Sequence, residues 1–376
     1  MKEDLKFLSE WTRDVQEDIK SVSRIKSADE IMVFMIGNTA NSDTNLLPYR
    51  TPLRKIVGGY VLGSVVFTQT QAIILASIVD GLVDYIFIDA EKKLVTIPSP
   101  DLEPFEFFNL SHFRPIKSVE YGNISRACIK VIDKTPVYEY KANDITIEAT
   151  WHFLIEKYTD LSGKNIVIIG AGNTGSKLAL KLVECGSSIS LVTNNSGRTK
   201  KVVEGLNKIK HKGVISEIKL KSEIDNSIKN VDAMIGCTNS FPVITSDMIS
   251  KMNHSGVVID LGKGTIEEDA INECIKRKIQ TWRVDISALV NSMVSSSRTM
   301  SHLVNKKFGR KVMPQGFGLI SGGFIGKKYD VIVDSYQNPR SIIGVVEKPG
   351  KIMIELDSQA KQNIESTRAI ITRDKN

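Results

Sequence analysis

The chain has 376 residues, of which 41% are hydrophobic and 25% charged, proportions that are ordinary for a globular protein and exclude a disordered or fibrous chain. This length allows two domains with separate cores. The net charge of +7 is dispersed among acidic residues, which favours anionic small molecules, and no nucleic-acid-binding motif accompanies it. The four cysteines lack metal-ligand spacing, so free thiols and no metal site are expected.

No segment predicts a targeting signal or a membrane span. Residues 1–30 are charged throughout, and the most apolar stretch, residues 56–90, is interrupted by glutamine and aspartate. We therefore expect a cytoplasmic protein whose partners include neither a membrane nor a nucleic acid.

The first 145 residues alternate between helical and strand patterns. Residues 4–27 carry an apolar stripe at helical spacing, and residues 31–36, 61–67 and 85–88 predict strands. Thr68 and Gln71 form a capping-box pattern that opens a helix ended by Gly81. Residues 98–115, rich in proline and aromatic side chains, predict a loop. The alternation indicates an α/β substrate or catalytic domain over residues 1–145.

A glycine turn follows the buried strand 166–169. Gly170, Gly172 and Gly175 have the G-x-G-x-x-G spacing, with Asn173 and Thr174 between them, and an amphipathic helix comes next. In this pattern the first glycine allows a tight turn and the second lets the backbone approach a pyrophosphate. The third lets helix pack on strand. These five residues are predicted to bind a dinucleotide; a glycine turn that binds nothing is the alternative.

The second strand of this unit, residues 189–193, indicates which dinucleotide binds. An NAD-specific protein usually has a carboxylate at its tip, for the ribose 2′-hydroxyl. Here the chain has Thr193, Asn194, Arg198 and Thr199, so no carboxylate repels a 2′-phosphate and a guanidinium is available to bind one. The sequence favours NADP, with NAD still possible; the alternative is that Arg198 only solvates a surface loop.

The rest of the chain completes this second domain and adds a third segment. A helix over 145–158 and strands at 216–220, 231–235 and 256–260 extend the nucleotide-binding unit over residues 146–285. A long helix over 286–308 and short strands between Gly and Pro signals fill residues 286–376. The predicted fold class is therefore α/β: a Rossmann-type parallel sheet, a separate N-terminal α/β domain, and a C-terminal helix with strands. The apolar stripe of the long helix suggests a homo-oligomer, with the C-terminal segment dimerising or packing on the N-terminal domain.

Residues 141–285 resemble the shikimate dehydrogenase-like Rossmann proteins, a group that includes glutamyl-tRNA reductase. Three segments carry the resemblance: the turn at 170–175 with its 193–199 loop, the strand-end segment 236–240, and the pair Asn143–Asp144. The resemblance implies that Thr238 lies beside the nicotinamide ribose and that Asp144 belongs to the catalytic site. Asp144 is followed by isoleucine where shikimate dehydrogenases have glycine.

The catalytic lysine of that family follows a Thr-x-Pro-x-Lys segment, and the nearest counterpart here is Tyr49–Lys55, with altered spacing. Lys55 and Asp144 are therefore the predicted catalytic pair, in which the carboxylate orients the ammonium for proton transfer. Two alternatives stay open: Lys55 as a surface lysine, and Asp144 as the N-cap of a helix beginning at Ile145.

These features predict an NADP-preferring dehydrogenase or reductase that moves a hydride between nicotinamide and a small polar, anionic metabolite. Two other functions remain open. One is a lyase or cyclase that uses tightly bound NAD as a transient redox cofactor. The other is a non-catalytic sensor that only binds a dinucleotide.

Overall fold

A computed structural model describes residues 2–39, 47–93, 123–193, 196–221, 229–238 and 242–373. The chain divides into two compact units, Met1–Asn291 and Ser292–Asn376. The first unit contains two β-sheets and the second contains one. The loop predicted at 98–115 lies outside the described residues.

The first sheet has the strand order β2-β3-β1-β4-β5, in which β2 is antiparallel and the other strands are parallel. Its strands are β1 (Ile31–Asn38), β2 (Tyr49–Ile56), β3 (Gly59–Val66), β4 (Tyr85–Asp89) and β5 (Val137–Tyr140). Its helices are α1 (Lys2–Ile25), α2 (Gln69–Val79) and α4 (Ile124–Ile129). The predicted strands 31–36, 61–67 and 85–88 correspond to β1, β3 and β4.

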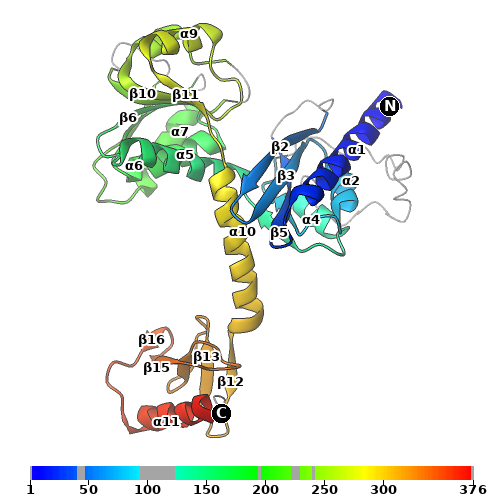
Figure 1. The fold of residues 1–376 in the computed structure, drawn as a ribbon. Coiled ribbons are helices and arrows are strands. Elements are labelled where there is room, and N and C mark those ends of the chain that lie inside the picture. The colour runs from blue at the N-terminus through cyan, green and yellow to red at the C-terminus, as the bar shows by residue number, and fades with distance from the viewer. Residues whose placement is uncertain are drawn as a thin grey trace. The chain divides into compact units, whose positions relative to one another are not determined.

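Helices α1, α2 and α4 cover one face of this sheet, as Figure 1 shows. The apolar stripe of α1 is buried against the sheet through Trp11, Val15 and Ile19. The predicted capping box is present at the start of α2, where Thr68 accepts from the Gln71 N–H and the Gln71 side chain accepts from the Thr68 backbone. The local sequence thus fixes where α2 begins.

The second sheet is fully parallel and has the order β11-β10-β9-β6-β7-β8. Its strands are β6 (Asn165–Ile169), β7 (Ser188–Val192), β8 (Ile218–Lys221), β9 (Val231–Gly236), β10 (Met252–Asp260) and β11 (Gln280–Arg283). Its helices are α5 (Ala142–Tyr158), α6 (Asn173–Glu184), α7 (Ser196–Ile209), α8 (Ser246–Ser250) and α9 (Glu268–Arg277).

In chain order the six strands lie 3-2-1-4-5-6, the order of a dinucleotide-binding sheet. One core joins the sheet to α5, α6 and α7, and a second core on the other face joins it to α8 and α9. The predicted Rossmann-type domain is therefore confirmed. Its crevice is expected where the order reverses, at the carboxyl ends of β6 and β9.

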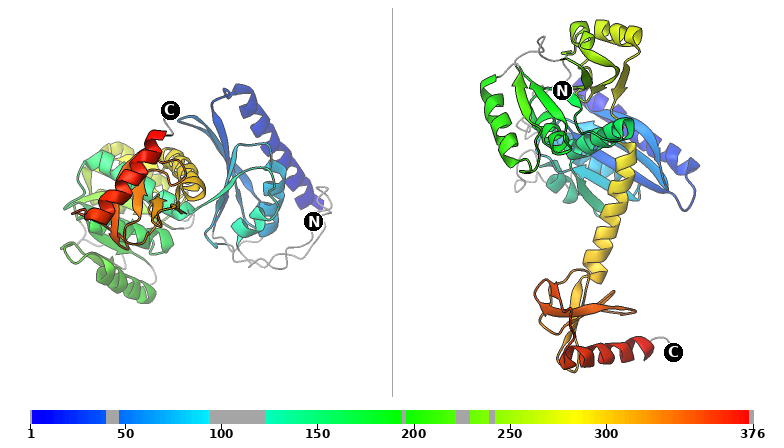
Figure 2. Two further views of the ribbon diagram at one scale, coloured as in Figure 1. Left: turned by 90° about the horizontal axis from the view of Figure 1, so that it is seen from below. Right: turned by 90° about the vertical axis from the view of Figure 1, so that its left-hand side faces the viewer.

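The second unit has a five-stranded sheet in the order β12-β13-β14-β15-β16. Its strands are β12 (Gly309–Val312), β13 (Gly318–Ser321), β14 (Val331–Val333), β15 (Ile342–Lys348) and β16 (Lys351–Ile352). Helix α11 (Ser358–Arg373) packs across one face of this sheet (Figure 2). The predicted long helix corresponds to α10 (Ser287–His302), and the next five residues, Leu303–Lys307, form a π-helical turn η1.

Among the described helices, none combines the length and the apolar character that crossing a membrane requires.

Candidate functional site

The glycine turn between β6 and α6 has the geometry that its sequence predicts. Gly170 adopts φ +111°, and a Cβ there would lie 2.9 Å from the carbonyl oxygen of Cys237. A Cβ at Gly175 would collide with the Gly170 carbonyl oxygen, so this glycine permits the helix to pack on the turn. Around Gly172, by contrast, nothing lies within 4 Å of a Cβ position.

Gly172 is the N-cap of α6, and no side chain caps this helix. The first N–H groups of the helix, at Asn173 and Thr174, therefore face the turn with the positive end of the helix dipole. This arrangement fits a pyrophosphate, which would accept those N–H groups beside the open space at Gly172.

The other predicted cofactor residues lie around this turn or follow β7. The Thr238 side chain lies against Gly170, 3.3 Å from the position of its Cβ. Thr193 follows β7, and its N–H donates to the Lys221 carbonyl. Thr199 is buried on α7. Asn194 and the side chain of Arg198 lie outside the described residues, whereas the backbone of Arg198 lies in the first turn of α7.

A chain of alternating charges lies at the carboxyl ends of β4 and β5, and the sequence had not predicted it. Lys93 pairs with Asp89 at 2.8 Å and with Glu91 at 2.8 Å. Lys177 on α6 pairs with Glu91 at 3.8 Å and with Asp144 at 2.6 Å. Lys141, the last member, also pairs with Asp144, at 2.5 Å. These three carboxylates and three ammonium groups, hereafter the ionic cluster, have a net charge of zero when all are ionised.

Burial differs strongly along the ionic cluster. The side chain of Asp89 is 0% exposed and that of Lys93 is 11% exposed, whereas Asp144 and Lys177 are 40% and 38% exposed. Desolvation raises the pKa of Asp89, although Lys93 opposes this shift. Partial burial also acts to raise the pKa of Asp144, but hydrogen bonds from Lys141 and Lys177 outweigh it and the pKa is lowered. Asp144 is therefore held in its charged form.

Asp144 is not the N-cap of its helix, contrary to one of the two sequence-based interpretations. Helix α5 begins at Ala142 with Lys141 as N-cap, which puts Asp144 in the first turn. There the positive end of the helix dipole stabilises a carboxylate. The neighbouring Asn143 donates from Nδ2 to Oδ1 of Asn173 at 3.2 Å. The predicted catalytic aspartate therefore lies beside the glycine turn.

Lys55 lies elsewhere. It pairs in register with Tyr60, near the amino end of β3, and its ammonium is 5.7 Å from the centre of the Tyr60 ring. The carboxyl end of β3 is at Val66, six residues or about 20 Å further along the strand. The structure therefore does not bring Lys55 and Asp144 together.

The first sheet reverses its strand order between β1 and β4, and Asn38 and Gly37 lie at that point. Asn38 is 6% exposed and donates from Nδ2 to the Glu91 carbonyl at 3.0 Å. Its Oδ1 is buried and has no hydrogen-bond partner among the described residues. The Tyr140 hydroxyl lies near Gly37, and burial, with the charges of Asp89 and Glu91, raises its pKa well above the ordinary value.

A further cation, Lys263, reaches the carboxyl edge of the first sheet from the loop after β10. Asp260 fixes this loop by accepting from the N–H groups of Gly262 and Gly264 at 3.1 and 2.7 Å. Lys263, at φ +64°, donates to the Tyr49 hydroxyl at 2.6 Å. Of the carboxylates that the structure describes, none lies within ion-pair distance of Lys263.

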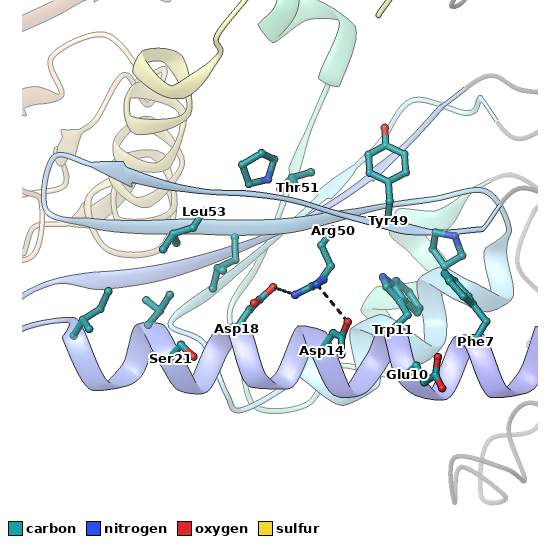
Figure 3. A pocket seen from close by; sticks show the side chains of 15 residues that line it. Phe7, Glu10, Trp11, Asp14, Asp18, Ser21, Tyr49, Arg50, Thr51 and Leu53 are labelled. Atoms are coloured by element: carbon teal, nitrogen blue, oxygen red, sulfur yellow. Dashed lines mark hydrogen bonds and ion pairs between the residues drawn. The ribbon is translucent and has the colours of Figure 1, made fainter.

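A groove of about 680 Å³ lies between α1 and β2, and neither the glycine turn nor the ionic cluster lines it. Figure 3 shows Arg50 pointing toward α1, where it pairs with Asp14 at 3.3 Å and Asp18 at 2.7 Å, while the Tyr49 hydroxyl points away from the helix. The charge of Arg50 is thus neutralised by two carboxylates of α1 that line the same groove, and no residue of the glycine turn lines it. The ionic cluster beside the glycine turn is the better candidate site.

Comparison with known proteins identifies the second sheet. The model of the family described as shikimate / quinate 5-dehydrogenase matches residues 154–286. This match confirms the resemblance drawn from the sequence, and with it an NAD(P)-dependent dehydrogenase module. No curated protein matches the sequence.

Several solved structures are similar in fold. One component of the dipicolinate synthase from Bacillus halodurans is 16% identical, with a TM-score of 0.34 over 72% of this chain and 97% of that one. A shikimate dehydrogenase in complex with NADP+ is 15% identical, with a TM-score of 0.37 over 68% and 85%. Shikimate 5-dehydrogenase from Listeria monocytogenes, in complex with shikimate and NAD, is 17% identical, with a TM-score of 0.30 over 40% and 54%. Values this low say nothing about activity.

Proposed function

We propose that this protein is an NADP-preferring oxidoreductase that transfers a hydride between nicotinamide and a small polar, anionic metabolite. The observation that carries the proposal is the ionic cluster, which joins the carboxyl edge of the first sheet to helix α6 of the nucleotide-binding turn. The pair Lys177–Glu91 supplies that junction, and the contacts Asp144–Lys177 and Asn143–Asn173 hold α5 against α6. A bound nicotinamide would supply or accept the hydride; the residues of this chain would handle the proton.

Lys93 is the proposed proton-transfer group, in place of Lys55. Reduction of a carbonyl carbon leaves negative charge on its oxygen, which an ammonium can stabilise and then protonate. Asp89 and Glu91 both hold the Lys93 ammonium at 2.8 Å, so its position is fixed by two carboxylates. Its low exposure limits exchange with bulk water.

The proposed role of Asp144 is to orient the substrate. Its carboxylate is kept ionised by Lys141 and Lys177, and it lies in the first turn of α5, beside the glycine turn. Lys177 is a positioning residue, because it ties Asp144 to Glu91 and thereby to Lys93.

The anionic character of the substrate is inferred from Lys263. In the first sheet the pairs Tyr49–Val65 and Val65–Gly37 place Tyr49 and Gly37 in one row at the carboxyl edge, two strand spacings or about 10 Å apart. Lys263, bound to Tyr49, therefore offers a positive charge at one end of the row. The Oδ1 of Asn38, beside Gly37, has no hydrogen-bond partner in the described part of the chain and offers an acceptor for a hydroxyl or amine.

Preference for NADP rests on residues 193–199. They contain no carboxylate, and Arg198 lies in the first turn of the helix that follows β7, where the 2′-phosphate of a bound cofactor is expected.

The first test is a fluorescence titration of the purified protein with NADPH and NADH, in the wild type and in Arg198→Ala. We expect tighter binding of NADPH, and loss of that preference in the variant. A carbonyl screen follows, in which each 2-oxo acid is paired with its methyl ester. Preference for the acids, abolished in Lys263→Met, supports the anionic substrate. Failure to bind either nucleotide would refute the proposal.

A further inference from the structure

The excess positive charge of the chain is confined to the second unit. Of the 50 Lys and Arg and 43 Asp and Glu, 14 and 7 lie in residues 292–376, which leaves 36 of each in residues 1–291. The nucleotide-binding unit is thus neutral, and a unit of 85 residues carries the whole net charge of +7. This separation indicates a surface for a negatively charged partner.

The sheet of this unit has one face covered by α11 and a second face that is only partly covered. Leu319, Val331 and Val345 lie in register across three strands and pack on α11. Residues that alternate with them point to the other face, where Arg310 pairs with Ile320 and Val312 pairs with Gly318.

The segment between β13 and β14 lies over this second face. A Cβ at Gly326 would lie 2.7 Å from the Ile320 side chain and 2.9 Å from Asp330. Asp330 accepts from Nε and Nη2 of Arg310, at 2.8 and 2.9 Å, and from the N–H groups of Gly318 and Lys327. The buried ion pair therefore anchors the base of a protruding loop.

Apolar side chains stand exposed on this face and on its loop. Ile325 is 68% exposed and Ile354, just beyond β16, is 95% exposed. Val312, Phe324 and Ile352 are also exposed. Basic residues adjoin them in sequence: Lys327 lies in the loop, and Lys348 and Lys351 flank the turn between β15 and β16. Lys328 is not counted among them, because its ammonium lies 4.8 Å from the centre of the Tyr329 ring, which packs on the α11 side. We call this set of apolar and basic side chains the basic apolar face.

We propose that the basic apolar face binds the surface of an anionic phospholipid bilayer, with Phe324 and Ile325 entering the headgroup region and the lysines contacting lipid phosphates. Most of the exposed apolar residues are aliphatic, so they cannot stack on bases as a nucleic-acid surface requires. They lie on a loop and at the end of a hairpin, and a fluid bilayer can adapt to such an uneven surface. Lysines beside apolar side chains are typical of interfacial binding.

The test uses the full chain and co-sedimentation with vesicles of phosphatidylcholine alone or with 30% phosphatidylserine. At 0.1 M NaCl we expect at least tenfold tighter binding to the phosphatidylserine vesicles, lost at 0.5 M NaCl. Phe324→Ser/Ile325→Ser should weaken binding without changing its salt dependence. Lys348→Glu/Lys351→Glu should weaken it more than about 25-fold, from about fivefold for each lysine.

The matched control is Lys361→Glu/Arg368→Glu on α11, which changes the net charge equally on the covered side of the sheet. It should weaken binding less than threefold, because charges further away than about 10 Å are screened at this salt concentration. Protection of β13 and β14 from hydrogen exchange checks that the second unit of every variant is folded. Equal losses in the two charge variants, absence of phosphatidylserine selectivity, or binding of a DNA duplex in place of vesicles would each overturn the proposal.

Discussion

Lys93→Met is the substitution that tests the ionic cluster most directly. Methionine keeps most of the side-chain length and removes the charge. Asp89, whose side chain is 0% exposed, then loses its cation, and Glu91 keeps only Lys177 at 3.8 Å. Removing one partner of a buried ion pair costs about 3–5 kcal/mol of folding free energy when the remaining charge stays ionised.

The loss should depend on pH, because Asp89 can be protonated. Burial already raises the pKa of Asp89, and removal of Lys93 raises it further. Between the unfolded pKa, about 3.9, and this raised value the folded state binds more protons, so stability falls as pH rises. The difference between wild type and variant is therefore small near pH 4.5 and approaches the full 3–5 kcal/mol, roughly, at pH 8.

The assay is urea unfolding followed by tryptophan fluorescence at pH 5 and pH 8. The three tryptophans, Trp11, Trp151 and Trp282, all precede residue 292, so the signal reports the first unit alone. Lys55→Met is the matched control; since Lys55 is exposed over the Tyr60 ring, it should cost less than about 1 kcal/mol at both pH values.

The same two variants separate the catalytic interpretations. Lys93→Met should lower turnover on the order of 10²- to 10⁴-fold with NADPH affinity unchanged, the range for loss of a proton-transfer group, while Lys55→Met should leave turnover normal. A Lys93→Met protein that matches the wild type in stability at pH 8 and in turnover would refute both the buried ion pair and its proposed role.

Three further outcomes follow from the geometry. Gly172→Ala should fold normally and bind NADPH weakly, because its Cβ would occupy the space where a pyrophosphate would lie. Gly175→Ala should instead destabilise the first unit, because its Cβ would strike the Gly170 carbonyl oxygen. Calorimetry and nucleotide titration distinguish the two variants. Arg198→Ala should weaken NADPH binding by about 1–3 kcal/mol and leave NADH unchanged in the same titration. Asp330 has a lowered pKa, so its contribution to the second unit is lost as pH falls through that pKa; Asp330→Asn should remove this acid dependence and speed hydrogen exchange in β13 and β14.

The nucleotide-binding turn was predictable because its determinants are local. Gly170 and Gly175 each lie against backbone that a side chain would strike, and their spacing of five residues follows from one turn of chain between a strand and a helix. The capping box at Thr68 was predictable for the same reason, since both of its hydrogen bonds span three residues. Such contacts leave a signature within a few residues of sequence.

The ionic cluster could not be found in this way, because its members are brought together by strand order. Strand pairing places Asp89 of β4 opposite Tyr140 of β5, the residue before Lys141, although 51 residues separate Asp89 and Tyr140. Lys177 reaches the cluster from helix α6. The sequence did contain one signal: the buried strand Tyr85–Asp89 is followed at once by Glu91 and Lys93. Charged residues directly after a parallel strand lie at the edge where α/β sheets bind ligands.

Strand direction also explains why a motif match alone could not place Lys55. A motif of threonine, proline and lysine can be matched by residue type, but β2 runs antiparallel to β3, so moving from Tyr49 to Lys55 leads away from the carboxyl edge. For Lys93, by contrast, strand direction and sheet order agree: β4 is parallel to β1 and β5 and ends beside the helix that carries Asp144. In a sheet of this kind the direction of the strand that precedes a charged residue is a better guide to a catalytic position than the residue types around it.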